Sequence, residues 1–300
     1  MKNSILKTLS YRAVFGYPLT ATEIEEFLIA KNKTRKTKQE IILAIRKMKD
    51  ITENNGYFQI KNLSSYLNNP KKFRKEREKC SREKIKLATK NLLPLGKVPS
   101  IKMVGITGSV AANNAKKNSD IDIFIICQKN TLWITRLVVV LYLKLKGVYF
   151  NTARPKNTIC PNIYISIDRL NWPISQRNLY TAHEVVMLIP IISKGKTYER
   201  FIGENLWTKR YLPNHKCFKL KARLQTLNYK LSAKMLFAIC YWLLDKILMT
   251  LQLKYMKKHG QITNEVLTRD LIHFKKVDSK NKVLDNYKKI LERLNINSPG

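Results

Sequence analysis

The sequence predicts an α+β protein, and three observations lead to this. Short apolar runs with strand character occur in the middle of the chain, at Ile101–Ile106, Asp120–Cys127 and Asn162–Asp168. Segments in which apolar residues recur at helical spacing separate and flank these runs. From residue 205 to the end the pattern is mostly helical. We therefore expect a central sheet with helices packed around it.

Residues 1–66 are predicted to form a small helical unit that ends in a β-hairpin. Apolar residues between Ile5 and Val14 mark one face of a first helix. Two capping boxes predict where the second and third helices begin: Thr20 with Glu23, and Thr37 with Glu40. The pair Asn55-Gly56 predicts the hairpin turn. Three helices followed by a hairpin resemble a winged helix.

A basic cluster precedes the third helix of this unit. It consists of Lys31, Lys33, Arg35, Lys36 and Lys38. In a winged helix the third helix enters a groove of the nucleic acid, so these cations could contact phosphates of RNA or DNA. The alternative is a solvated basic linker on a unit that is structural or serves dimerisation, and the sequence leaves both interpretations open.

Residues 67–96 are predicted to form a basic helical connector. Lysines and arginines crowd its first half. Such a run is usually a solvated face, and it can also attract a polyanion. Leu93-Pro94-Leu95 ends the helix. The boundary with the N-terminal unit is expected near residues 68–70.

The central region, residues 97–204, holds the residues with the clearest chemical meaning. Gly108-Ser109 follows a predicted strand, and a glycine there lets the backbone approach a phosphate closely. Asp120 and Asp122 are two positions apart on the next strand, so their carboxylates point to the same face. Two carboxylates on one face can share divalent cations, and a pair of hard cations suits in-line phosphoryl transfer.

This pattern of an apolar residue, Gly-Ser, a gap of about ten residues and Asp-apolar-Asp resembles the polymerase-β-type nucleotidyltransferases. The similarity extends less sharply over residues 97–200, towards bacterial proteins with a nucleotidyltransferase domain and no known substrate. The resemblance implies a mixed β-sheet core with two Mg²⁺ ions bound by Asp120 and Asp122. It also implies a nucleoside triphosphate (NTP) whose phosphates are held by Gly108 and Ser109. Without it, the acids could simply cap turns or pair with lysines on a buried strand.

In that family a third carboxylate from a neighbouring strand completes the metal site and often acts as general base. Asp168 is the candidate here, although it lies at the end of its strand and Ser166 takes the central place. If the third acid is missing, nucleotide binding would persist while transfer would be slower or absent.

Three further residues are candidate accessory groups. His183 and Glu184 lie in the first turn of a predicted helix, where they could orient substrate or act as acid and base. The alternative for this pair is a helix cap or a structural hydrogen bond. Arg136 lies on a predicted helix at 132–145 and could reach phosphates, or could lie at the surface.

The charge balance favours anionic partners. Fifty-seven Lys and Arg against 21 Asp and Glu give a net charge of +36, which favours RNA, DNA or nucleotides. The alternative is a proteome that fills protein surfaces with lysine regardless of function, because the charge is spread along the whole chain.

Cysteine usage and hydropathy indicate the compartment. The five cysteines are scattered and lack C-x-x-C spacing, which favours reduced thiols over disulfides or a zinc site. The N-terminus has no apolar core of a secretory signal. The apolar run Met235–Gln252 contains Asp245 and Lys246, which favours a buried helix over a membrane span. We expect a cytoplasmic protein without stable membrane insertion.

These patterns predict an Mg²⁺-dependent nucleotidyltransferase that moves a nucleoside monophosphate from an NTP to the hydroxyl of an unknown acceptor and releases pyrophosphate. The helical region 205–300 would close the cleft over substrate. One alternative is a winged-helix regulator that binds nucleic acid and senses nucleotide through a non-catalytic transferase fold. Another is a toxin–antitoxin component of the minimal nucleotidyltransferase type.

Overall fold

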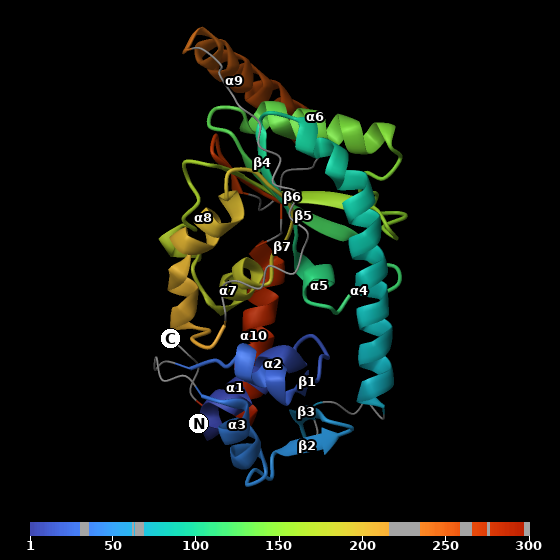
Figure 1. Cartoon of the computed structure of the whole chain (residues 1–300), viewed down its shortest axis with the longest axis vertical. Helices are drawn as coiled ribbons and strands as arrows, with labels where there is room; N and C mark the ends of the chain where they lie inside the picture. The colour runs from blue at the N-terminus through green and yellow to red at the C-terminus, as the bar shows by residue number, and fades with distance from the viewer. Residues whose placement is uncertain are drawn as a thin grey trace.

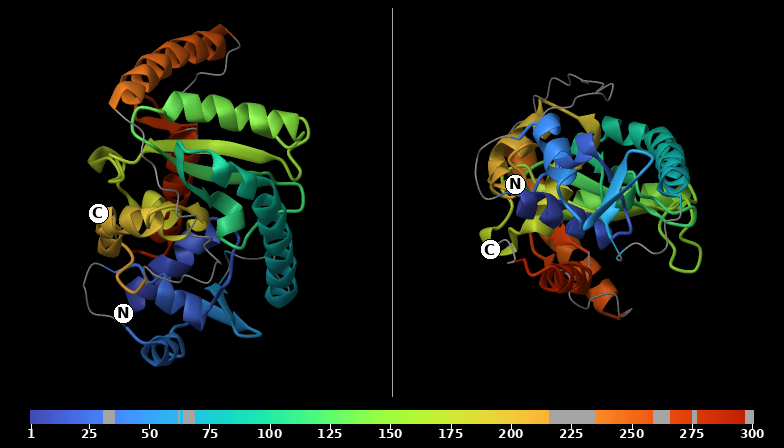
Figure 2. Two further views of the ribbon diagram at one scale, coloured as in Figure 1. Left: turned by 45° about the horizontal axis from the view of Figure 1, so that its top comes forward. Right: turned by 90° about the horizontal axis from the view of Figure 1, so that it is seen from below.

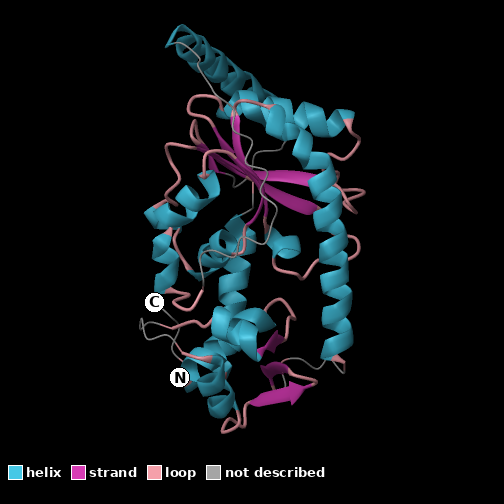
Figure 3. Ribbon diagram, in the orientation of Figure 1, coloured by secondary structure: helices cyan, strands magenta, loops and turns pink. Residues whose placement is uncertain are grey.

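The computed structural model describes residues 1–30, 36–61, 63, 69–215, 235–258, 266–274 and 277–296. Within these residues, a mixed six-stranded sheet with the strand order β7-β4-β5-β6-β9-β8 lies at the centre of the molecule (Figures 1 and 3). The predicted α+β class with a mixed sheet is thus confirmed. The strands are β4 (Ile101–Ile106), β5 (Ile121–Cys127), β6 (Ile159–Ser166), β7 (Ile189–Ser193), β8 (Val266–Leu267) and β9 (Leu271–His273).

Helices cover both faces of this sheet, which explains why β5 is apolar almost throughout. Ile121, Ile123 and Ile125 belong to the core cluster on one face, and Phe124 and Ile126 belong to the cluster on the other. The first face packs on α6, and beyond it lies α9; the second packs on α7 and α8 (Figure 2). These helices are α6 (Leu132–Leu145), α7 (Leu179–Val186), α8 (Thr197–Glu204) and α9 (Met235–Lys258).

Strand β6 runs parallel to β5 and contains an irregularity near its start. Pro161 lies opposite Ile123, whereas Ile163 lies opposite Phe124, so Asn162 is an additional residue in the ladder. A proline cannot donate a ladder hydrogen bond and commonly marks such a position. The strand also begins three residues earlier than the sequence predicts, at Ile159. This early start places β6 residues beside the acids of β5.

The long helix α4 (Pro70–Leu92) runs along the side of the molecule from the N-terminal unit to the sheet (Figure 1). Its buried face includes Arg74, whose guanidinium donates to the Glu23 carboxylate at 2.7 and 3.0 Å and to the Pro18 carbonyl at 2.6 Å. The prediction of a solvated basic face is therefore wrong for Arg74. The helix joins the two parts of the molecule by side-chain contacts as well as through the chain.

The N-terminal unit contains the predicted helices and hairpin. Both capping boxes form, at Thr20 and at Thr37. Asn55 and Gly56 have φ of 53° and 79°, as the two-residue hairpin turn requires. The elements are α1 (Lys2–Ala13), β1 (Leu19–Thr20), α2 (Ala21–Glu26), α3 (Lys38–Ile45), β2 (Ile51–Asn54) and β3 (Tyr57–Ile60), the strands pairing in the order β1-β3-β2 within the described segments.

Nucleic-acid binding by this unit stays a prediction. Lys31, Lys33 and Arg35 of the basic cluster lie outside the described residues. Lys36 forms a partly buried ion pair with Glu40 at 3.3 Å. The comparison with a winged helix therefore depends on the order of helices and hairpin alone.

The C-terminal region is not purely helical, because β8 and β9 extend the sheet beyond β6. Ile272 of β9 is fully buried opposite Tyr164. In α9, Asp245 is buried and its carboxylate accepts from the Ile134 N–H of α6 at 2.8 Å, whereas Ile247 is exposed. The expected buried helix is thus a surface helix with one packed face. None of the helices in the described segments is long and apolar enough to cross a membrane.

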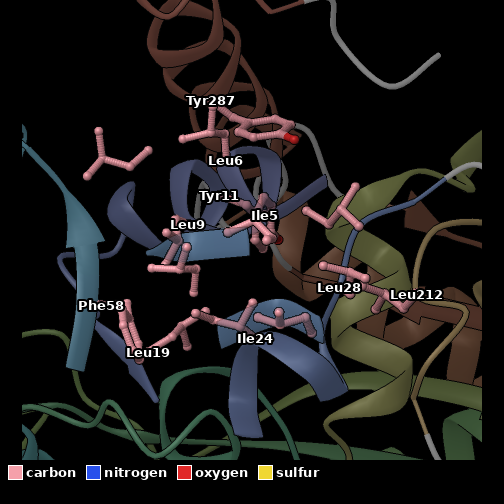
Figure 4. Packing of buried hydrophobic residues seen from close by; sticks show 14 of the residues in the cluster. Ile5, Leu6, Leu9, Tyr11, Leu19, Ile24, Leu28, Phe58, Leu212 and Tyr287 are labelled. Atoms are coloured by element: carbon pink, nitrogen blue, oxygen red, sulfur yellow. The ribbon is translucent and has the colours of Figure 1, made fainter. Parts of the chain in front are cut away.

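The two ends of the chain share one core (Figure 4). Helix α10 (Val277–Arg293) packs on α1. Its Tyr287 and Leu291 are buried in the same cluster as Ile5 and Leu9 of α1. This cluster also includes Leu179 and other residues of the central region. The predicted domain boundaries at residues 66, 96 and 204 stay predictions, and this core extends across them.

Candidate functional site

The site is built at the end of β4, where the chain turns sharply. Thr107 is buried, and its N–H donates to the Asp122 carbonyl at 3.0 Å. Gly108 has φ of 68°, a left-handed conformation that favours glycine. A Cβ at Gly108 would collide with Oδ2 of Asp122. Glycine is therefore required both by the backbone conformation and by the closeness of the acid. Ser109 follows it, exposed, in the four-residue helix α5 (Gly108–Ala111).

Asp120 and Asp122 lie together at the start of β5. Asp120 directly precedes the strand and Asp122 is its second residue, and both are half-buried. Cys160 of β6 lies opposite Asp122 in the parallel register. Ligand atoms of Asp120, Asp122 and Cys160 all lie within 4.8 Å of one another. This group could hold a divalent cation. Its carboxylates suit hard ions such as Mg²⁺, and its thiol suits softer ones.

Asn162 fixes the orientation of Asp122. Its side-chain amide donates to Oδ1 of Asp122, and its own Oδ1 accepts from the Cys160 thiol at 3.5 Å. The irregular register of β6 brings the amide to this position. A thiol and an amide therefore occupy the strand positions beside the acid pair, where the resemblance implies a carboxylate.

Asp168 lies at the opposite end of β6. Ser166 is paired with Cys127 at the far end of β5, and Asp168 is two residues further on. Its carboxylate accepts from the Ser166 hydroxyl and forms an exposed ion pair with Lys129 at 3.8 Å. The structure thus does not bring Asp168 to Asp120 and Asp122. Cys160 occupies the neighbouring position instead.

Two buried residues of α4 hold the loop that leads to Asp120. The Lys84 ammonium donates to the Ser119 carbonyl at 2.6 Å and to the Asn157 side chain at 2.9 Å. The Ser81 hydroxyl accepts from the Ala115 N–H at 3.1 Å. Burial lowers the pKa of Lys84 below its ordinary value. Ser81 and Lys84 were not identified from the sequence. Their spacing of three, which places both on one face of the helix, is the signal that could have found them.

A cleft of about 230 Å³ opens beside the Gly108-Ser109 turn. The central region and the N-terminal unit each form part of its wall. The lining residues are Thr107, Gly108, Ser109, Ala112, Asn114 and Asp122 around the turn, Tyr180, His183, Glu184 and Met187 from α7 and its end, and Tyr11, Arg12 and Phe15 from α1 and its end. The contribution of α1 could not be predicted from its sequence, since its apolar spacing indicates only a buried face.

His183 and Glu184, both predicted as accessory groups, line this cleft. The Glu184 carboxylate accepts from the Thr107 hydroxyl at 3.2 Å. The His183 Nδ1–H donates to the Leu179 carbonyl at 2.9 Å, and the ring stacks on Tyr11 with centroids 4.2 Å apart. Burial is the main cause that lowers the pKa of His183 to about 3. His183 is thus neutral at physiological pH and serves as a packed wall of the cleft.

This low pKa predicts a loss of stability in mild acid. The ordinary histidine pKa of about 6.5 applies to the unfolded chain, which therefore takes up the proton first. The free energy of unfolding is expected to fall by about 2 kcal/mol between pH 7 and pH 5 through this residue alone. Urea unfolding at both pH values, of the wild type and of His183→Phe, measures it. The variant should show the smaller decrease, and equal decreases would contradict the prediction.

Arg136 lies away from the cleft. Its guanidinium donates to the Gln252 side chain of α9 and lies 5.2 Å from the centre of the Phe274 ring. These contacts tie α6 to α9 and to the end of β9. The structure thus gives Arg136 packing contacts outside the cleft, and contact with phosphates, one of the two possibilities for this residue, stays a prediction.

Residues 69–159 match the family model described as a nucleotidyltransferase domain. The matched segment begins at the cap of α4, contains Gly108-Ser109 and the acid pair, and ends at the first residue of β6. No curated protein and no solved structure matches the chain. The resemblance of the Gly-Ser and Asp-x-Asp pattern to this family is confirmed over the matched segment, and Cys160 and Asn162 lie just beyond it.

Proposed function

We propose that the protein transfers a nucleoside monophosphate from an NTP to the hydroxyl group of an acceptor, on the basis of the match of residues 69–159 to a nucleotidyltransferase domain. The observation that carries this proposal is the closeness of Asp122 to the Gly108 backbone at the edge of the cleft. A phosphate held at the turn would thus lie next to the carboxylates that bind its counter-ions.

Each residue of the turn and the acid pair has a role in this proposal. Gly108 lets the backbone approach the β- and γ-phosphates, and Ser109 offers a hydroxyl donor to them. Asp120 and Asp122 would hold two Mg²⁺ ions, for which carboxylate oxygens are suitable donors. Bound divalent cations supply charge neutralisation to the phosphates in such reactions. Asn162 keeps the Asp122 carboxylate turned towards Asp120 and Cys160.

In the transfer itself the acceptor oxygen bonds to the α-phosphorus, while the bond from that phosphorus to the bridging oxygen of the β-phosphate breaks. Pyrophosphate leaves with the electron pair of the broken bond, and the acceptor hydroxyl loses its proton. We assign acceptance of this proton to Glu184, which lines the cleft and is held by Thr107. His183 cannot take this role, because burial keeps its pKa near 3 and its Nδ1–H is bound to Leu179.

A transfer assay with labelled NTPs tests the proposal. The protein is incubated with each NTP and with total RNA, small hydroxyl compounds or protein as acceptor, in Mg²⁺ and separately in Mn²⁺, because the thiol of Cys160 favours softer ions than oxygen donors do. We expect incorporation by the wild type and none by Asp120→Ala. Asp168→Ala is the matched control, because it removes a carboxylate from the other end of β6. If both variants lose incorporation equally, Asp168 also belongs to the site. If the wild type incorporates nucleotide into none of the acceptors, the proposal is contradicted.

The second candidate function is a regulator that binds nucleic acid and senses nucleotide without turning it over. Two observations favour it: a thiol and an amide lie beside the acid pair in place of a third carboxylate, and the N-terminal unit has three helices and a hairpin in its described segments. Retention of DNA that weakens steeply with salt, together with bound NTP and no incorporation, would support this function over the first.

A further inference from the structure

Arg12 of α1 is a buried arginine at the wall of the cleft. It is only 5% exposed and is one of the lining residues. Its guanidinium lies 4.5 Å from the centre of the Tyr17 ring and 5.7 Å from that of Phe27, and Nη1 donates to the Met187 sulfur at 3.9 Å. Its Nε is buried and has no hydrogen-bond partner among the described residues. The chain thus keeps a cation at the cleft that its own side chains bind only weakly.

Arg74 is the contrasting case: its Nε also has no partner among the described residues, but its Nη1 and Nη2 are bound by carboxylates and a carbonyl. It is 3% exposed, forms hydrogen-bonded ion pairs with Glu23 and Glu78, and donates to a backbone carbonyl. Arg12 has no carboxylate within ion-pair distance in the described part of the chain. Burial lowers the pKa of Arg12, partly offset by Tyr17 and by the Glu23 carboxylate that Arg74 already binds. A buried charge that lacks a hydrogen-bonded anion is costly, which is a reason to look for an anion from outside.

The cleft places Arg12 and the Gly108-Ser109 turn on walls of one small volume. We propose that Arg12 binds a phosphate group of the NTP held at this turn, so that the N-terminal unit supplies one wall of the nucleotide site. This inference rests on the proposed function. A guanidinium suits the role because its donors can form two parallel hydrogen bonds to phosphate oxygens.

The other residues of the wall agree with a nucleotide as occupant. Tyr11 and Phe15 come from the same end of the chain, and Tyr180 faces the same volume. Aromatic and apolar surface suits the sugar and base of a nucleotide, while Arg12 and the turn suit its phosphates. The N-terminal unit would then act in nucleotide binding and not as an independent reader of nucleic acid.

Binding measurements on variants of the full chain test this inference. The ligands are the four NTPs, inorganic tripolyphosphate and the unphosphorylated nucleosides, titrated calorimetrically into wild type, Arg12→Met, Arg12→Lys and Arg136→Met. Arg12→Met is expected to weaken NTP and tripolyphosphate binding by about 10- to 100-fold, the usual contribution of hydrogen bonds to a charged group. Arg12→Lys is expected to weaken it by about tenfold, because an ammonium cannot form the two parallel bonds. Arg136→Met, the control arginine outside the cleft, should bind like the wild type.

The outcomes separate this inference from the proposed function. NTP affinity that is equal in Arg12→Met and wild type overturns the inference and leaves the transferase proposal standing. If tripolyphosphate binds through Arg12 and NTPs do not bind, the phosphate site stands and the nucleotide proposal fails. If the wild type binds neither, both are overturned. Circular dichroism checks the fold, and if Arg12→Met is unfolded, unchanged affinity in Arg12→Lys overturns the inference.

Discussion

Replacing Gly108 with alanine is expected to lower the rate of the proposed nucleotidyl transfer at least about a hundredfold, since displacing a reacting group by about 1 Å can cost that much. The new methyl group would collide with the Asp122 carboxylate. The backbone cannot easily move away, because the Thr107 N–H is bonded to the Asp122 carbonyl. The Asp122 side chain would therefore turn out of the group that it forms with Asp120 and Cys160. Steady-state transfer rates, and calorimetric titration with Mn²⁺, measure the two effects.

Gly147→Ala is the matched control for this variant. Gly147 has φ of 67°, against 68° for Gly108, and no described atom lies within 4 Å of the position that a Cβ would take. Both alanines carry a similar cost of about 1–2 kcal/mol in free energy of unfolding, because both adopt the left-handed conformation. Only Gly108→Ala should lose transfer and ion binding. Equal activity in the two variants would mean that Asp122 does not act from this position.

Arg74→Met is expected to lower the free energy of unfolding by about 3 kcal/mol, because breaking a buried ion pair leaves the remaining charge without a partner. Its guanidinium is buried among Glu23, Glu78 and the Pro18 carbonyl, and it lies 4.0 Å from the centre of the Tyr17 ring. Methionine fills much of the volume and restores none of these hydrogen bonds. Urea unfolding at neutral pH measures the change. Arg82→Met, on an exposed part of the same helix and 3.9 Å from Glu78, should change stability by less than about 0.5 kcal/mol.

The decrease in the free energy of unfolding at low pH gives an independent check on the Arg74 contacts. Burial alone would raise the pKa of Glu23, but the hydrogen bonds and charge of Arg74 outweigh it, and the pKa lies below the ordinary value of 4.5. The contribution of Glu23 to stability is therefore present at neutral pH and is lost as the pH falls below about 4.5. In Arg74→Met this loss should shrink. If the free energy of unfolding falls equally at low pH in the wild type and in Arg74→Met, the assigned ion pair between Arg74 and Glu23 is contradicted.

Sequence patterns predicted those parts of the fold and site that depend on neighbouring residues. The capping boxes at Thr20 and Thr37 are short-range hydrogen-bond patterns, and both form as expected. The pairing of the Gly108-Ser109 turn with Asp120 and Asp122 is equally local, because the turn and the acid strand are consecutive along the chain. The family match extends over this same stretch.

The residue beside the acid pair depends on how strands pair, and the sequence does not state that. Strands β5 and β6 are parallel, so the start of one lies beside the start of the other. Asp122 is near the start of β5, and its neighbours are therefore Cys160 and Asn162, not Asp168 at the other end. The additional residue Asn162, which follows Pro161, also interrupts the regular alternation of side chains in β6. The positions of Cys160 and Asn162 therefore could not be predicted from that alternation.

The cleft wall from α1 was missed for a similar reason. Tyr11 and Arg12 reach the cleft because α1 packs against α10 and Tyr11 stacks on His183 of α7, and such packing leaves no local signature. Arg12 is one of 57 basic residues in the sequence, and nothing in its immediate neighbours distinguishes it from a solvated arginine.

The shared core of α1 and α10 has a consequence for biosynthesis. Helix α1 can bury Leu6 and Tyr11 fully only after Tyr287, which lies far along the sequence, has been translated. Contacts of such long sequence separation form slowly and leave apolar surface exposed in the meantime. A nascent chain stalled before α10 should therefore remain bound to chaperones, and translation through α10 should release it.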